Sequence, residues 1–272
     1  MKELELIKNH FTPVQPTVKM ENGKVTYQEI RPAKDVALSN FVYCFWQLKT
    51  QRQLDRPFVY RVVSDGCIDI FFNHKRPTEN FVMGFCRKAT EFSIGQTFDY
   101  IGIRFFPTAF PILYGTNAKT LSNQSQELKL VLPELSNWIT THIAPLHSLE
   151  KVIEQLTLKL TQHVEKGGFK HDQRFLNALN LIFRRKGYLD TEKELSTGLS
   201  PRQLRRVFNF YIGTTAKTFS NVVRFQHILN AKPSKLSLKE NKLYLDVGFF
   251  DQAHFIKNFK TFYGVTPSEA FH

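Results

Sequence analysis

The chain has 272 residues, of which 42% are hydrophobic and 22% charged, a composition that supports two domains with a buried core in each. No apolar run is long enough to span a bilayer, and the charged N-terminus lacks the apolar segment of a signal peptide. The formal net charge is +13. We therefore expect a cytoplasmic protein that does not work in a membrane.

The cysteines give no sign of a disulfide framework. Cys44, Cys67 and Cys86 are only three, and each lies in an apolar segment. No pair of Cys or His residues has the close spacing of a metal site. We expect buried, reduced thiols, no metal and no cofactor; a redox sensor is the less favoured alternative.

The first part of the chain has the pattern of β-strands. Aromatic and β-branched runs separated by turn-rich segments predict strands at 41–48, 58–63, 67–72, 81–85 and 98–106. Asp65-Gly66 lies between the second and third of these runs, where it predicts a hairpin turn. The number and spacing of the runs predict a small antiparallel sandwich or barrel.

Three charged residues interrupt the apolar strands: Arg61, Asp69 and Arg104. Alternation along a strand usually places such residues on the solvent face of a half-exposed sheet. We expect that position for all three, in preference to a pocket.

The hydrophobic period changes to that of helices from about residue 126. Apolar residues at three- and four-residue intervals predict a helix over 149–164, and an earlier helix covers 128–143, interrupted or started by Pro133. These helices cover the sheet, or alternatively form a dimerisation surface. Paired glycines at 167–168 then mark the boundary between a β-rich domain, 1–166, and a helical domain, 167–272.

The positive charge is concentrated beyond that boundary. Residues 166–272 hold 18 Lys and Arg against 8 Asp and Glu, whereas residues 1–165 hold 19 against 16. Such asymmetry suits a polyanionic partner, nucleic acid before an anionic membrane.

A capped helix near 201–211 carries part of this charge. Gly198 stands at a turn, Ser200 at the N-cap and Pro201 at the first helical position, and Gly213 ends the unit. Helical spacing places one group of residues on the buried side: Leu204, Phe208 and Tyr211. The opposite stripe holds Arg202, Arg206 and Asn209, flanked by Arg205 and Gln203. Arginine can pair with guanine and asparagine with adenine, so the stripe suits base edges.

The same arrangement occurs again near 251–263. Asp251 is placed to cap the helix and Gly264 to end it, and Thr266-Pro267 to start a short following helix. Upstream, "NKLYLDVGFF" predicts a first helix that ends at Gly248, which completes a helix-turn-helix unit. One side of the second helix is aromatic: Phe255, Phe259 and Phe262. The other holds Ala253, Lys257 and Lys260, with Gln252 and His254 near its start.

A third helix joins the two units. Residues 214–231 have helical period and would span roughly 27 Å, which approaches the roughly 34 Å between successive major-groove faces of B-DNA. A charged helix face is often merely solvated, but that interpretation weakens here because the capped, charged helix occurs twice.

These residues resemble the DNA-binding region of the AraC-type transcriptional regulators over roughly residues 170 to 271. "GFFDQAHFIKNFKTFYGVTP" is close to the family signature, and "GLSPRQLRRVF" followed by Gly213 matches its first unit. The family usually has Leu-Ala where this chain has Lys193-Glu194 and Leu243-Tyr244, so we expect Leu195 to take the core position of the first unit. The resemblance implies a domain of two helix-turn-helix units, joined by a long helix, that binds promoter DNA, most often as an activator.

By matching positions, the resemblance implies base contacts from Arg202, Arg205 and Arg206 in the first unit and from Gln252, Ala253 and Lys257 in the second. The N-terminal part is similar, more loosely, to a sensor-like β domain of some of these regulators. The implied partners are double-stranded DNA, RNA polymerase, a small-molecule effector in the N-terminal domain and a second copy of the chain. The expected fold class is α+β.

Two other functions compete with a non-enzymatic regulator. DNA alkylation-repair proteins fuse a similar reader domain to a methyl-accepting cysteine, but their Pro-Cys-His-Arg run is absent here. A nonspecific nucleic-acid or membrane-surface binder would explain the charge without explaining the repeated capped helix.

Overall fold

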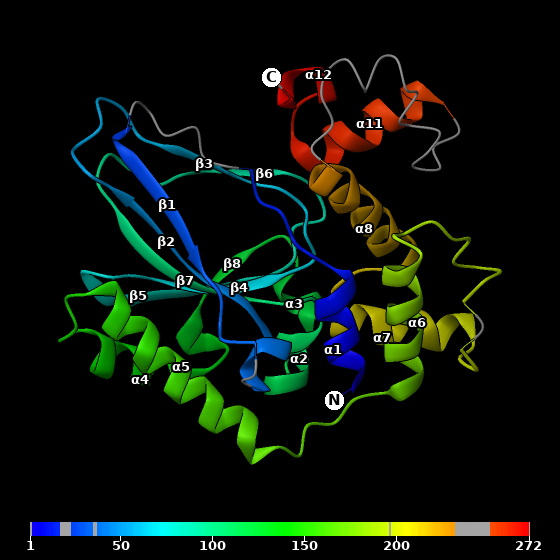
Figure 1. Cartoon of the computed structure of the whole chain (residues 1–272), viewed down its shortest axis with the longest axis horizontal. Coiled ribbons are helices and arrows are strands. Elements are labelled where there is room, and N and C mark those ends of the chain that lie inside the picture. The colour runs from blue at the N-terminus through cyan, green and yellow to red at the C-terminus, as the bar shows by residue number, and fades with distance from the viewer. Residues whose placement is uncertain (1, 17–22, 35–36, 196, 232–250, 272) are drawn as a thin grey trace.

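The computed structural model describes residues 2–16, 23–34, 37–195, 197–231 and 251–271. An antiparallel sheet with flanking helices forms the N-terminal part, and a set of helices forms the C-terminal part (Figure 1). The α+β prediction is confirmed. Within the described residues, no helix has both the length and the apolar character needed to cross a membrane.

The main sheet has six strands in the order β1-β2-β7-β4-β5-β8. All its neighbouring strands pair antiparallel. The strands are β1 (Val25–Ile30), β2 (Val42–Thr50), β4 (Ile68–Asn73), β5 (Arg76–Met83), β7 (Asp99–Phe105) and β8 (Ser125–Glu127). A separate two-stranded sheet pairs β3 (Val59–Val62) with β6 (Thr90–Ser93). Each of the five predicted runs overlaps a strand, although β5 begins five residues before the predicted run at 81–85.

The predicted hairpin at Asp65-Gly66 is wrong. The strands on either side of it, β3 and β4, belong to different sheets, and β4 forms its hairpin with β5 instead. Asp65 accepts a hydrogen bond from the Cys67 amide at 2.9 Å, and Gly66 has a φ of +79°. The dipeptide therefore makes a tight turn, but one that passes the chain between sheets.

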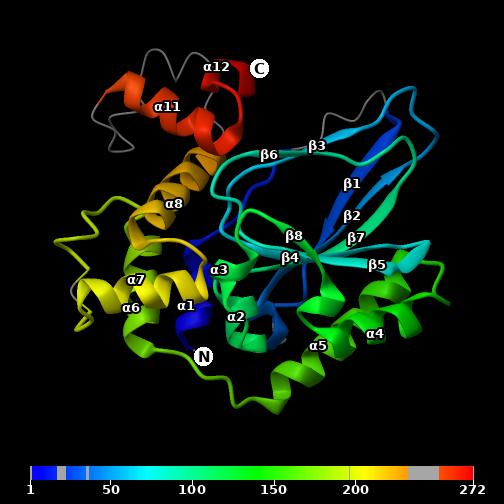
Figure 2. The same cartoon turned by 180° about the vertical axis from the view of Figure 1, so that it is seen from behind.

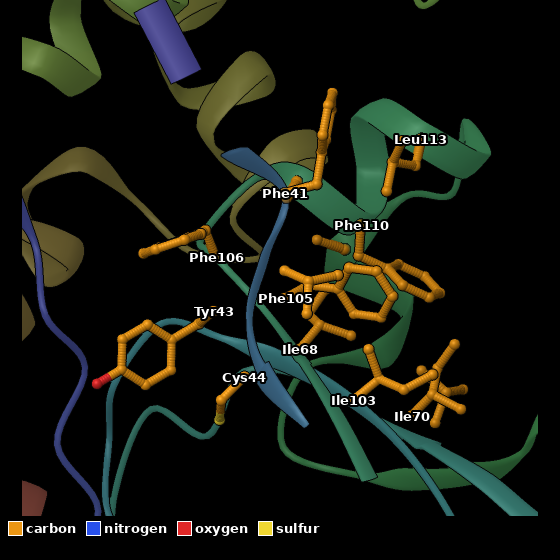
Figure 3. Close-up of a cluster of buried hydrophobic side chains, with 14 of the residues drawn as sticks. Phe41, Tyr43, Cys44, Ile68, Ile70, Ile103, Phe105, Phe106, Phe110 and Leu113 are labelled. Carbon is orange, nitrogen blue, oxygen red and sulfur yellow. The ribbon is translucent and has the colours of Figure 1, made fainter. Parts of the chain in front are cut away.

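One face of the main sheet is aliphatic and aromatic, and helices cover it. Ile68, Ile70, Ile103 and Phe105 point toward α2 (Ala109–Tyr114), as Figure 3 shows. Phe105 and Phe110 make an edge-on contact with ring centroids 5.5 Å apart. α3 (Ala118–Leu121) follows α2 in the chain. Of two short 3-10 turns, η2 (Ala37–Asn40) packs against α5 (Leu149–Lys166) and β2, and η3 (Leu128–Leu130) packs against α4 (Pro133–Ile143) and β5.

The opposite face of the main sheet is also covered, which corrects the expectation for two charged residues. Arg104 is only 3% exposed and the Asp69 side chain only 15%. The two are register partners on β7 and β4, and they line a cavity beneath the β3–β6 sheet. Arg61 lies on β3 with its side chain 33% exposed and pairs with Glu91, so only this residue has the expected position on a half-exposed sheet.

The two helices predicted after residue 126 are present. α4 (Pro133–Ile143) starts at Pro133, and α5 (Leu149–Lys166) is capped by the Ser148 hydroxyl, which accepts from the Lys151 amide. Ser136 of α4 donates to Asn80 of β5 at 2.7 Å. α4 therefore packs on the sheet, as the simpler interpretation predicts.

The C-terminal part contains α6 (Gln173–Arg184), α7 (Pro201–Tyr211), α8 (Ala216–Ala231), α11 (Gln252–Tyr263) and α12 (Pro267–Ala270). Between α6 and α7 the described backbone forms turns but no helix, and at Asp190–Glu194 the Glu194 amide donates to the Asp190 carbonyl at 2.8 Å. The first unit thus has turns where the resemblance implies a full helix. Leu195 is 8% exposed, which confirms its predicted core position. The predicted helix at 241–250 lies outside the described residues.

The N-terminal segment packs against the C-terminal helices. α1 (Lys2–His10) lies along α6, and the Phe11 ring meets that of Phe183 at 4.8 Å. Further along, the Val14 amide donates to the Gln226 side chain of α8 at 2.7 Å. Gln15 donates to the Val63 carbonyl at 3.0 Å. Residues 11–15 therefore link α8 to the β domain.

Candidate nucleic-acid interface

Local sequence explains why α7 begins where it does. The Ser200 hydroxyl accepts from the Gln203 amide, and the Gln203 side chain accepts from the Ser200 amide at 2.9 Å, which completes a capping box. Pro201 occupies the first turn, where its missing N–H costs nothing. On the buried side, the Phe175 ring contacts Phe208 at 5.0 Å and Tyr211 at 4.7 Å. α7 is thereby fixed to α6.

The opposite side of α7 presents its cations to solvent. Arg202, Arg205 and Arg206 are exposed, and none of them forms an ion pair within the described part of the chain. Asn209 is half-buried, and its amide donates to the Arg205 carbonyl at 2.9 Å. Three of the predicted contact residues are thus available to a ligand, whereas Asn209 would have to give up an internal hydrogen bond.

α11 is built in the same way. The Asp251 side chain accepts from the His254 amide at 2.7 Å, and Gly264 ends the helix with a φ of +95°. Phe255, Phe259 and Phe262 are all buried. The predicted buried side of this helix is confirmed.

The exposed side of α11 holds the other predicted contact residues. Gln252, Ala253 and Lys257 are all exposed, and they fall on the first two turns. Ala253 offers no side chain that would keep a surface away from the backbone. A ligand surface can therefore come close to the N-terminal end of α11, and the Lys257 cation lies one turn further along the helix.

α8 holds the two capped helices apart. Its Phe219 ring contacts Phe183 of α6 at 5.6 Å, and its Phe225 ring contacts Phe259 of α11 at 5.5 Å. With 16 residues, α8 is about 24 Å long. In both Figures 1 and 2, α7 and α11 lie near opposite ends of α8, with their N-terminal ends turned away from the sheet.

Both capped helices are attached to the β domain near their C-terminal ends. The Ser64 amide donates to the Phe262 carbonyl at 3.2 Å, and the Ala89 amide donates to the Thr261 carbonyl at 3.0 Å. The Ser122 hydroxyl donates to the Gly213 carbonyl at 2.9 Å, just after α7. These contacts satisfy carbonyls at or just beyond the helix ends, where the helix itself supplies no donor. Sequence reasoning missed them, because nothing in the local pattern marks a loop amide as a partner of a distant helix.

Comparison with protein families assigns both parts of the chain. Residues 196–272 match a helix-turn-helix domain family. The chain carries an AraC-type helix-turn-helix domain at its C-terminus. Residues 28–127 match a domain of unknown function. The AraC-type domain makes this chain a DNA-binding transcription regulator, and it includes both α7 and α11.

Solved structures of ToxT from Vibrio cholerae are similar to this chain over most of its length. An apo lysine-to-alanine variant from strain SCE256 has 11% identity and a TM-score of 0.43 and covers 83% of this chain and 96% of its own. ToxT from strain O395 has 13% identity and a TM-score of 0.38 and covers 92% and 97%. A search of curated proteins finds no match. At these scores the likeness adds nothing to the assignment of the AraC-type domain.

Proposed function

We propose that this regulator reads two successive major grooves of one DNA duplex, with α7 in the first and α11 in the second. The single observation that supports it most is the matched mounting of the two helices. Each is capped by a side chain at its N-terminal end and attached to the β domain at or just after its C-terminal end. Recognition helices contact base edges mainly through their N-terminal residues.

In this proposal the exposed residues of α7 read the first block of the site. Arg202, Arg205 and Arg206 supply forked donors for guanine or phosphate, and Asn209 reads adenine after releasing the Arg205 carbonyl. In the second block, Gln252 contacts a base edge, Ala253 packs against a base, and Lys257 contacts guanine or phosphate. Selectivity comes from these contacts, while phosphate contacts supply affinity that falls steeply with salt.

Selection of genomic DNA fragments with the purified full-length chain tests the proposal. We expect an asymmetric motif of two short blocks about one helical turn apart, because one chain supplies both readers without two-fold symmetry. As a control, a variant with all three α7 arginines replaced by alanine should still select the second block. A single block, a palindrome of identical blocks, or fragments with no motif would contradict the two-groove arrangement.

Activation is the second part of the proposal. It requires a contact with RNA polymerase, so transcription from a selected promoter with purified polymerase should rise when the protein is added. A fall in transcript would indicate a repressor.

We further propose a small-molecule effector in the N-terminal domain, and a homodimer through α4 and α5, where Leu158 is 53% exposed. Sedimentation tests the homodimer.

We propose no enzymatic role, because the thiols are in the wrong environment for the competing methyl-transfer chemistry. A methyl-accepting cysteine needs a thiolate, which a nearby cation or histidine stabilises. Cys86 is buried, and burial raises its pKa to about 12. Incubation with methylated DNA should leave Cys86 unmodified, as detected by mass spectrometry.

A further inference from the structure

A partly open cavity of about 130 Å³ lies between the two sheets of the β domain. Its floor is the face of the main sheet that carries Arg104, and its roof is the β3–β6 sheet. An engineered apolar cavity of about 150 Å³ is large enough to bind benzene. The cavity therefore has room for a small ligand built around a single ring.

Five aromatic residues of the described part of the chain line the cavity. Trp46 and Phe71 lie on the floor with ring centroids 6.3 Å apart, and Tyr100 meets Phe71 edge-on at 6.0 Å. Tyr60 and Phe92 line the cavity from the β3–β6 sheet. The faces of such rings attract cations, because the ring quadrupole is negative on the face.

Glycine at position 102 makes room for the Trp46 ring. A Cβ atom at Gly102 would lie 2.1 Å from the nearest ring carbon, so the indole lies against the bare backbone of β7. Its Nε1 donates to Asp69 at 3.2 Å. The ring is thus held between the sheet and a carboxylate, which fixes its orientation toward the cavity.

Among the residues that the structure describes, the charged groups at the floor do not balance. Arg104 donates to Asp69 through Nε at 3.1 Å and through Nη2 at 2.9 Å. Asp65 is 6% exposed and also lines the cavity, where its Oδ2 lies 3.7 Å from Arg104 Nε. Glu29 lies 3.6 Å from Arg104 Nη1. One guanidinium is therefore surrounded by three carboxylates.

This imbalance favours a positively charged ligand. Asp65 shares the Arg104 guanidinium with Asp69, so its buried charge is only partly compensated, and a ligand cation would offset the remaining cost. An anionic ligand would find Arg104 Nε and Nη2 already donating to Asp69. Of the guanidinium nitrogens, only Nη1 lacks a hydrogen-bond partner among the described residues, and the Glu29 carboxylate lies 3.6 Å from it, where it would repel an anion. A sugar ligand would need many polar groups in the cavity wall to bind its hydroxyls, whereas most of the lining residues are apolar or aromatic.

We propose that this cavity binds a small organic cation, an aromatic amine or ammonium compound, with its charge near Asp65 and its ring among Trp46, Phe71 and Tyr100. The inference rests on the proposal that the N-terminal domain binds an effector, and it names the chemical class. Gln15 donates to Asp65 Oδ2 at 2.7 Å, so the ligand would share this carboxylate with the segment that links α8 to the β domain.

Titration with three ring-sized probes tests the proposal: benzylammonium, benzyl alcohol and benzoate. The titration uses the Trp138→Phe variant, in which Trp46 is the one remaining tryptophan and serves as the fluorescent reporter. We expect saturable quenching by benzylammonium at a concentration about tenfold lower than by benzyl alcohol, and none by benzoate. Equal binding of the alcohol, tighter binding of benzoate, or no saturation by any probe would overturn the inference.

Asp65→Asn then tests the position of the charge. The asparagine keeps an acceptor for the Cys67 amide but removes the charge, so benzylammonium should lose about tenfold in affinity and benzyl alcohol should not change. Asp55→Asn is the matched control, because the Asp55 side chain is 88% exposed and Asp55 does not line the cavity. If Asp65→Asn does not fold, the ranking of the three probes on the unsubstituted pocket still decides.

DNA selection separates this inference from the regulator proposal. A protein that selects the two-block motif but does not prefer benzylammonium refutes only the ligand class. A protein that binds benzylammonium but selects no motif refutes the two-groove proposal and leaves the ligand class standing.

Discussion

Lys257 is the lysine on the exposed side of α11 nearest to its N-terminus. Replacing it with alanine should weaken binding to the second block by about 1–3 kcal/mol, because one base-edge or phosphate contact is lost. Lys151→Ala is the matched control, since Lys151 is exposed on α5 in the other part of the molecule. Gel-shift titration with each block mutated in turn measures the effect, and an unchanged affinity would contradict the assignment.

Arg206 is the corresponding test for α7. Arg206→Ala should cost about 1–3 kcal/mol at the first block only. Combined with Lys257→Ala, the two losses should add within about 0.5 kcal/mol, because the residues contact different parts of the site. The same titration with a two-block duplex measures this. Strong coupling between the two substitutions would show that the helices do not read separate blocks.

His74 gives the β domain a dependence on pH. It lies 3.2 Å from Asp99 and 3.0 Å from the Leu146 carbonyl, and the hydrogen bond with Asp99 raises its pKa above the usual 6.5 despite partial burial. A raised pKa means that protonation stabilises the folded state. This contribution is complete below pH 6.5 and is lost as pH rises through the raised value.

The Tm of the wild-type chain should therefore exceed that of His74→Gln by more at pH 5.5 than at pH 8.5. Thermal unfolding at both values measures the difference. His10→Gln, at an exposed position, serves as the control. A gap between wild type and His74→Gln that widens as pH rises would contradict the assignment of the charge to His74.

At the scale of elements, the capping box of α7 connects helix stability to DNA reading. Ser200→Ala should cost about 1 kcal/mol of folding free energy, because it removes the acceptor for the Gln203 amide. It should also weaken binding to the first DNA block, because the first turn of α7, which contains Arg202, would fray without its cap. Ser148→Ala removes the analogous cap of α5 and should lower stability without affecting DNA binding. Urea unfolding and block-specific titration distinguish the two variants.

The elements that the sequence predicts well are those determined by local chemistry. Caps at Ser200 and Asp251, and the aromatic period of α11, depend on neighbours a few residues away, so α7 and α11 have the expected limits and exposed sides. The pairing of β3 with β6 depends on residues about thirty positions apart, and the Asp65-Gly66 dipeptide carries no information about it. For the same reason the sequence predicts a solvent-exposed Arg104, because no neighbouring residue in the sequence indicates that a second sheet covers it.

At the scale of the whole molecule, the second reader shares a hydrophobic core with the β domain. Val63 and Phe85 from the N-terminal part are buried in one cluster with Phe225, Phe259 and Phe262. The position of α11 therefore depends on side chains from the β domain. The sequence could predict that these residues are apolar, but not that they belong to one core, because they come from segments far apart in the chain.

Phe85→Leu tests this dependence. The substitution should lower the free energy of unfolding by roughly 1–2 kcal/mol. It should also weaken binding to the second DNA block, because α11 loses part of its packing. Phe72→Leu is the matched control: Phe72 is equally buried but belongs to the other core cluster, which includes no residue of α11. It should lower stability by a similar amount and leave the second block unchanged. Equal effects on DNA binding would contradict a specific role for the shared core.

The placement of α1 against α6 has a consequence for synthesis. The ribosome makes the first helix more than 160 residues before the helix that it contacts, so Leu4, Ile7 and Phe11 have no partner on α6 while the sheet is being made. The sheet is free to form earlier, since domains generally fold as units during translation. Docking of α6 onto α1 would then be one of the last steps of folding.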